Sequence, residues 1–544
     1  MKNIKCKKVI FLLVINFAYI LNIYSQEILG SNTDIYYNFL ALKDLNIERP
    51  ALNYKTSSNN IWNSIDEEHE SNTKAFKKLV SKDNLKFYIF YPELFNSYNS
   101  KFPYGYNDKG LWQGKGYNAY FSSGFYLSYK CFSFNFKPQI NFSQNKEFDY
   151  YPSATENKYG YYVNNIDFPQ RHGDLPFFSF DFADTEIRYN YKTFTIGFGT
   201  ENPWLGPAQI NPMLGSTNAT GYPKIDIGFN KTNIFLPFFD YYLGKIELRI
   251  ANGCLIESKY YDSLRNNDYR MLNLFSIAYE PSFMPGFSLG INRVFITYWK
   301  PENFKYIWRL FTTEHSNALA SSGNDEDQKI AIFVDWLLPS AGFEFYGELG
   351  IDDFTNDSLA NPFHTAIYTV GVKQRIPFFN NLDGQLLVEL NNFEMSQDFQ
   401  LQWPYIGYYG HGFVKQGYTN DGQILGAGTG QFGNSQFISY KIFYNKGYSS
   451  IFFHRYCPNN NYTYNKAVNN SANSGDSELN KNWYANFPTY LVFGTKSGVA
   501  VNRYLNLEPE LCLVYAHNRL YKYKTNDCNT SICIICIAEK FIFI

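Results

Sequence analysis

The stretch Glu186-Ile-Arg-Tyr-Asn-Tyr-Lys-Thr-Phe-Thr-Ile-Gly-Phe-Gly199 shows the pattern that decides the fold. Apolar residues alternate with polar ones up to Tyr191, and after only two further residues the alternation resumes at Phe194. Because successive side chains of a β-strand point to opposite faces, each half predicts a strand with one apolar face. The short break between them predicts a β-hairpin with a very tight turn.

The same period of two recurs in short segments separated by Gly, Asn, Asp or Pro, as in residues 132–137, 287–292, 343–349 and 385–390. At ~10 residues per crossing, residues 84–521 have room for on the order of 16 to 18 strands. We therefore expect an all-β fold, a large transmembrane antiparallel β-barrel wide enough for an aqueous interior. A secreted β-sandwich also alternates, but charged off-face residues and aromatics near the strand ends favour the barrel.

The composition is compatible with strands in which apolar residues alternate with polar ones. The chain holds 51 Phe and 48 Tyr, with 20% aromatic and 18% charged residues and a net charge of -1, whereas ordinary globular domains carry about 25% charge. A net charge near zero argues against nucleic acid as a partner. After residue 26 no apolar run is long enough for a spanning helix, since the nearest covers only 532–538.

The N-terminus predicts export. An apolar run from Val9 to Ile23 follows a cluster of lysines, which is the pattern of a signal peptide over residues 1–25. An N-terminal membrane anchor is the alternative, but the run is short and interrupted by two asparagines. We expect residues 26–83 to form a small, partly helical periplasmic segment, and residues 84–521 to form the barrel in the outer membrane of a Gram-negative bacterium.

The sequence contains no convincing catalytic, cofactor-binding or metal-binding motif. The elbow-like Gly286–Gly290 lies within an alternating strand rather than at a strand-to-helix turn. The dinucleotide-like Gly428–Gly433 is followed by another strand instead of a helix. The seven histidines show no metal-ligand spacing, and we interpret carboxylate pairs such as Glu344 and Glu348 as lumen charges rather than a glycosidase pair. The sequence therefore predicts no enzyme, no cofactor and no metal site.

Four ordered stretches resemble the capsule-assembly Wzi family in its Bacteroidetes form, and residues 48–56 with Trp62 are similar to that family's N-terminal region. The stretches are Tyr104-Gly-Tyr-Asn-Asp-Lys-Gly-Leu-Trp-Gln-Gly-Lys-Gly116, Ile166-Asp-Phe-Pro-Gln-Arg171, Gly199-Thr-Glu-Asn-Pro-Trp-Leu-Gly-Pro207, and Gln416-Gly-Tyr-Thr-Asn-Asp-Gly-Gln-Ile-Leu-Gly426 followed by Gly433-Asn-Ser-Gln436.

The resemblance implies an outer-membrane barrel with a small helical periplasmic element. It also implies a non-enzymatic, lectin-like role in which the protein binds exported capsular polysaccharide and holds it at the cell surface. Aromatic faces and planar polar groups hold sugars, and the motif stretches supply six candidates: Trp112, Gln113, Arg171, Glu201, Asn202 and Trp204. The alternative function is a diffusion porin or transport channel, which requires an open lumen, whereas a capsule-binding barrel is expected to have a plugged or narrow one.

The C-terminus departs from the usual pattern of a closing strand that ends in an aromatic residue. Residues 522–544 change composition abruptly and hold three of the eight cysteines: Cys528, Cys533 and Cys536. We therefore expect an atypical, truncated or frameshifted tail, with the last one or two strands altered or missing and barrel closure in doubt.

Overall fold

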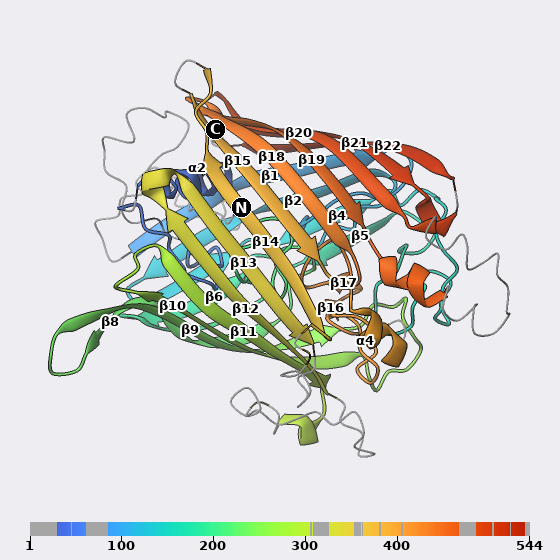
Figure 1. Cartoon of the computed structure of the whole chain (residues 1–544), viewed down its shortest axis with the longest axis horizontal. Coiled ribbons are helices and arrows are strands. Elements are labelled where there is room, and N and C mark those ends of the chain that lie inside the picture. The colour runs from blue at the N-terminus through green and yellow to red at the C-terminus, as the bar shows by residue number, and fades with distance from the viewer. Residues whose placement is uncertain are drawn as a thin grey trace, which may run out of the picture.

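The computed structural model describes residues 30–44, 46–60, 62, 85–304, 307, 326–352, 361, 363–379, 382–403, 406–466, 486–502, 505–522 and 524–538. The expected signal peptide, 1–25, and residues 63–84 lie outside these ranges. Figure 1 shows long tilted strands that wrap around an interior filled with chain. No helix of the described residues has the length and hydrophobicity needed to cross a membrane.

The wall is a closed antiparallel sheet of 18 positions, at the upper end of the predicted 16 to 18. β3 and β4 share one position, because both pair with β2, and β5 and β6 share the next. The strands are β1 (Leu85–Asn99), β2 (Gly116–Tyr129), β3 (Phe132–Phe136), β4 (Gln139–Ser143), β5 (Phe177–Asp181), β6 (Glu186–Tyr191), β7 (Phe194–Gly199), β8 (Lys224–Leu236), β9 (Tyr241–Ile256), β10 (Tyr269–Pro281), β11 (Phe287–Tyr298), β12 (Glu326–Leu338), β13 (Phe343–Asp352), β14 (Ala366–Arg375), β15 (Asp383–Asn392), β18 (Asn434–Tyr444), β19 (Gly447–Cys457), β20 (Thr489–Asn502), β21 (Leu505–His517) and β22 (Asn526–Ala538).

The predicted hairpin over residues 186–199 is confirmed as β6 and β7, with Tyr191 paired to Phe194 across the turn. The alternation has the expected consequence in the wall. In β8, Lys224 and Asp226 are buried toward the lumen, whereas Ile225 is 50% exposed on the outside. Exposed apolar side chains all around a closed barrel are the mark of an outer-membrane protein, since only a closed sheet satisfies its own backbone in lipid.

The two ends of the barrel differ. Tight turns such as 192–193 and 445–446 lie at one end, and long connections such as 144–176 and 393–433 lie at the other. Outer-membrane barrels have short periplasmic turns and long extracellular loops. The end with the tight turns is therefore periplasmic, and the end with the long connections is extracellular. The long connections carry the short helix α4 (Gln397–Gln402) and the small strands β16 (Thr419–Asn420) and β17 (Gln423–Ile424).

The helix α2 (Asn32–Ala41) lies at the periplasmic end, as expected for a small helical element. Its N-cap Ser31 accepts a hydrogen bond from the Asp34 N–H at 3.2 Å, which satisfies one of the free donors of the first turn. Phe39 stacks on Phe443 of β18 with ring centroids 4.2 Å apart. The chain after α2 enters the lumen, where Asn53 donates to Ser276 at 2.7 Å.

The expectation of a missing closing strand is wrong. β22 pairs with β21 along its whole length and with β1 from Ser531 to Ile537, so it closes the barrel from within the presumed tail. The physical reason is that its alternation is intact: Asn529 and Ser531 are buried toward the lumen while Ile532 and Ile534 are 43% and 40% exposed outside. The cysteine-rich composition hides a pattern that still fits lipid on one face.

Candidate functional site

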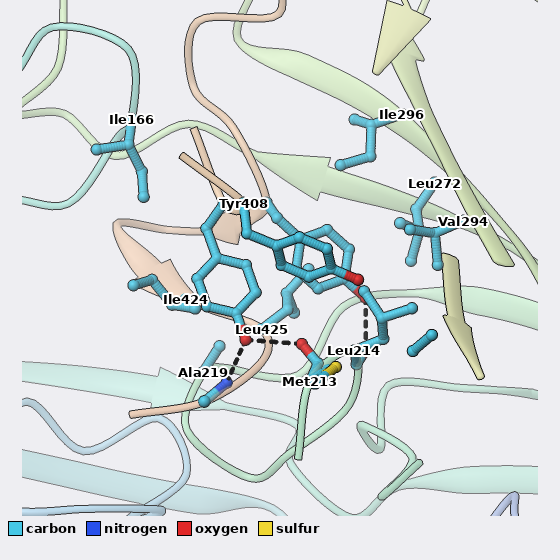
Figure 2. Close-up of a cluster of buried hydrophobic side chains, with 14 of the residues drawn as sticks. Ile166, Met213, Leu214, Ala219, Leu272, Val294, Ile296, Tyr408, Ile424 and Leu425 are labelled. Carbon is cyan, nitrogen blue, oxygen red and sulfur yellow. Dashed lines mark hydrogen bonds between the residues drawn. The ribbon is translucent and has the colours of Figure 1, made fainter. Parts of the chain in front are cut away.

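The extracellular half of the lumen is filled by protein. Residues 200–223, between β7 and β8, turn inward and pack against residues 406–427 to form what we call the plug. Figure 2 shows Met213, Leu214 and Tyr408 of the plug beside Leu272 and Val294 of the wall. The barrel is wide, as its strand count predicted, but protein occupies this half of the lumen, because apolar inward-facing residues of β10 and β11 are covered by the plug.

Polar contacts fix the plug to itself and to the wall. The Tyr409 hydroxyl donates to the Met213 carbonyl at 2.8 Å and accepts from the Ala427 N–H at 2.9 Å. The Glu348 carboxylate, on β13, accepts the N–H groups of Ala208 and Met213, both at 3.0 Å. Glutamates at such positions satisfy loop backbone that would otherwise be buried without partners.

A second wall glutamate, Glu389 of β15, holds the same loop. Its carboxylate accepts the N–H groups of Gln209 at 2.6 Å and Asn211 at 2.8 Å, and the Tyr346 hydroxyl donates to it at 2.8 Å. Glu348 and Glu389 are lumen charges, as the sequence suggested for such carboxylates, and they bind protein backbone.

Two of the predicted sugar-binding residues, Glu201 and Asn202, lie buried at the base of the plug. Glu201 accepts the Ser57 N–H at 2.6 Å. Burial, together with the nearby carboxylates of Asp184 and Glu186, raises the pKa of Glu201 to about 8. Asn202 donates to the Ala219 carbonyl at 2.9 Å. Both side chains thus join segments of the interior.

Gln113 and Trp204 line a cavity of about 550 Å³ between the plug and α2. The Trp204 indole N–H donates to the Ala208 carbonyl at 2.9 Å. Gln113 accepts from the Ser97 hydroxyl at 2.7 Å and donates to Asp108 at 3.0 Å. Burial raises the pKa of Asp108 to about 7. These two residues face an internal cavity and not the cell exterior.

Trp112 and Arg171 lie instead on the extracellular loops. Trp112 stacks on His172 with centroids 4.3 Å apart, and His172 contacts Tyr260 at 5.1 Å. The chain of partly exposed rings continues over Tyr159 at 5.6 Å from Tyr260. We call this surface the aromatic ledge, and it consists of Trp112, Phe148, Tyr150, Tyr159, His172 and Tyr260.

Arg171 supports the ledge from below. The residue is only 4% exposed. Its guanidinium donates to the Asn145 carbonyl at 3.1 Å and forms an ion pair with Asp174 at 3.1 Å. It also lies over the Phe148 ring at 5.9 Å. Arg171 therefore positions the loop that carries the rings, and it offers little surface of its own.

The ledge combines aromatic faces with a polar rim. Lys259 lies over the Tyr260 ring at 5.1 Å, and Lys158 pairs with Asp174 at 2.8 Å. Burial lowers the pKa of His172 to about 3, so the ring under Trp112 is neutral. Within the described residues, the buried Trp112 Nε1 and His172 Nε2 atoms have no hydrogen-bond partner.

Sequence reasoning missed most of this surface. The signal was the density of aromatic residues in the loop after β4, where Phe148, Tyr150 and Tyr159 stand close together. Tyr260 comes from a different loop, and only the fold brings it to His172. Among the described residues, no three His, Cys, Asp or Glu side chains are grouped to hold a metal ion.

A family model described as capsule assembly protein Wzi matches residues 99–469, more than half of the chain. That range covers the plug and all the ledge residues. No curated protein matches the chain.

Among solved structures the chain is similar to Wzi of Escherichia coli, an outer-membrane protein described as a carbohydrate-binding β-barrel involved in group 1 capsule assembly. The two are 13% identical, with 82% of this chain and 84% of that chain covered and a TM-score of 0.53, which shows a shared fold. OprB of Pseudomonas putida is 12% identical over 84% of this chain and 94% of that chain, with a TM-score of 0.38. OprD of Pseudomonas aeruginosa is 7% identical over 83% and 96%, with a TM-score of 0.39.

Proposed function

Since the chain belongs to the Wzi family of capsule assembly proteins, we propose that it is a non-enzymatic outer-membrane protein that binds exported capsular polysaccharide and holds it at the cell surface. The E. coli relative of the same fold is described as carbohydrate-binding. Attachment requires only a binding surface that faces outward, and no reactive group.

The aromatic ledge is the observation that supports this proposal best. Sugar rings stack their C–H faces on aromatic rings, and partly exposed Trp112, Tyr159 and Tyr260 present such faces in a row. Lys259 and Lys158 at the rim supply donors for hydroxyl or acidic groups of the polymer. A repeating polymer gains from a row of similar sites, because each added contact raises the effective concentration of the next unit.

The remaining predicted residues take supporting roles in this proposal. Arg171 positions the ledge loop, Glu201 and Asn202 hold the plug, and Gln113 and Trp204 lie in the internal cavity. The filled extracellular half of the lumen disfavours the porin alternative, because a diffusion channel needs a continuous aqueous path.

The proposal is tested by the fate of the polymer in cells. A strain that lacks the gene should make normal amounts of surface polysaccharide but release most of it into the medium, and the wild-type gene should restore retention. Trp112→Ala should fail to restore it. Trp299→Ala is the matched control, because Trp299 is 41% exposed just after the extracellular end of β11 and lies outside the ledge. Full retention without the gene would overturn the attachment role.

A further inference from the structure

The barrel wall has a break between β7 and β8. β7 ends at Gly199 and β8 begins at Lys224, directly opposite, because the 24 residues between them form part of the plug. Above this level, no strand of the described part of the chain adjoins the outer edge of β5. All residues from 177 to 223 are described, and within the described ranges the main chain of β5 pairs only with β4. A closed barrel thus contains a short free strand edge.

The opposite side of the break has partners. Beyond the last β8 pairing, the Cys254 N–H of β9 donates to the Pro223 carbonyl at 2.9 Å. The Ile256 N–H donates to the Asn420 side chain at 2.9 Å, and the Ile256 carbonyl accepts from Asp421 at 3.0 Å. The plug therefore covers the β9 edge. In an antiparallel strand of five residues, about two N–H and two C=O groups point away from the paired side, so β5 leaves about four groups for another partner.

The free edge lies at the depth of the outer leaflet. Phe178 and Phe180 of β5 face outward and are 75% and 58% exposed. Phe178 contacts Phe142 at 4.8 Å, and Phe142 contacts Tyr117 at 6.1 Å, which forms an extracellular aromatic girdle. At this interface, unpaired backbone groups that face the lipid need a polar partner such as a headgroup or a sugar, because lipid tails cannot hydrogen-bond.

The aromatic ledge spans the same break from above. His172 contacts Phe177, the first residue of β5, at 5.6 Å, and Tyr260, four residues after β9, at 5.1 Å. Trp112 stacks on the same imidazole. A saccharide on the ledge is thus next to a wall edge that has free backbone groups and is flanked by bare phenylalanines.

We propose that the polysaccharide bound here is the lipid-linked end of the polymer, a glycolipid of the outer leaflet. This rests on the proposed function and specifies its substrate. Sugars next to the lipid occupy the ledge, hydroxyl or phosphate oxygens nearest the membrane meet the N–H groups of β5, and acyl chains lie against Phe178 and Phe180. One amphipathic molecule thereby satisfies the ledge, the polar edge and the apolar face together, which neither a free polysaccharide nor a plain phospholipid does.

The test uses the purified full-length protein in detergent and three probes from the source cells. These are surface polysaccharide with its lipid end intact, the same polymer after alkaline removal of the acyl chains, and rough lipopolysaccharide without the polymer. The intact polymer should bind at least about tenfold more tightly than the deacylated one, since even two methylene groups in apolar contact are worth that factor. This comparison needs no variant.

The variant Phe178→Ser/Phe180→Ser should bind intact and deacylated polymer equally, and it should leave the affinity for deacylated polymer unchanged. Phe493→Ser is the control, since Phe493 is 62% exposed on β20, away from the break. Equal binding of intact and deacylated polymer to the wild type would overturn the inference and leave the attachment role standing. Binding of neither would overturn the attachment role. Equal binding of rough lipopolysaccharide would also overturn the inference, since the occupant would then be that lipid.

Discussion

Removing Glu348 and Glu389 together should unseat the plug without dismantling the barrel. These two carboxylates accept five backbone N–H groups of residues 208–213 at 2.6 to 3.1 Å. The plug's own apolar core and the 18-position wall stay intact in Glu348→Ala/Glu389→Ala. The double substitution therefore weakens the attachment of the plug to the wall.

The size of the effect follows from the bonds lost. A buried N–H group left without its partner costs about 1–3 kcal/mol, and non-additivity within one loop reduces the total to roughly 6 kcal/mol. Since 1.4 kcal/mol is a factor of ten, the ratio of seated to displaced plug should fall by about four powers of ten. The displaced plug then becomes a measurable population.

Conductance in planar bilayers measures this directly, and hydrogen exchange of residues 205–216 reports the same event. The wild type should show little steady conductance, and the double variant should show frequent openings with faster exchange in the plug. Glu510→Ala is the control, because Glu510 is a lumen carboxylate that pairs with Lys496 and does not contact the plug. Wild-type exchange and conductance in the double variant, or porin-like conductance in the wild type, would refute the reasoning.

Three further outcomes are expected. Glu201 is protonated in the folded protein at neutral pH because its pKa is raised from 4.5 to about 8. The stability that it contributes is therefore complete below pH 4.5 and is lost as the pH rises through 8. Glu201→Gln should flatten the fall of the urea midpoint between pH 5 and 8.5, and an unchanged slope would contradict this assignment. A chain that ends at Lys522 lacks β22 and exposes the edges of β1 and β21, so it should show no heat-modifiable, membrane-inserted form on gels. Arg171→Ala should reduce polymer retention together with protease resistance of the 144–176 loop, whereas loss of retention with a fully resistant loop would indicate direct contact with sugar.

The wall was predictable because its physics is local. A strand between lipid and lumen must alternate, and the alternation of residues 186–199 located both strands of a hairpin and its turn. The same alternation is present in β22, and the expectation of an altered tail was wrong because it rested on the three cysteines and the change in composition. Whether a segment forms a strand of the wall depends on which residues face the lipid and which face the lumen, and overall composition does not describe that order.

The plug was not predictable in this way, because its segments meet only in the folded chain. Leu205 and Leu425 belong to the same apolar core, and no periodic pattern in the sequence connects them. The lumen strands looked suited to water because glutamates and asparagines alternate with apolar residues. Many of these polar groups bind the backbone of the plug, as Glu348 and Glu389 do, and sequence alone gives no difference between a carboxylate that faces water and one that faces N–H groups.

The packing of the plug explains why two of the Wzi-like motifs have their particular residues. Two of the four, 199–207 and 416–426, fall within the plug, and their glycines lie where a side chain would collide. A Cβ at Gly426 would lie 2.1 Å from the Met213 carbonyl oxygen, and one at Gly417, with a φ of +65°, would lie 2.1 Å from that of Tyr409. Such positions are constrained by packing. These two motifs thus mark the interior that blocks the lumen, and sugar contacts are better sought among the partly exposed rings of the ledge.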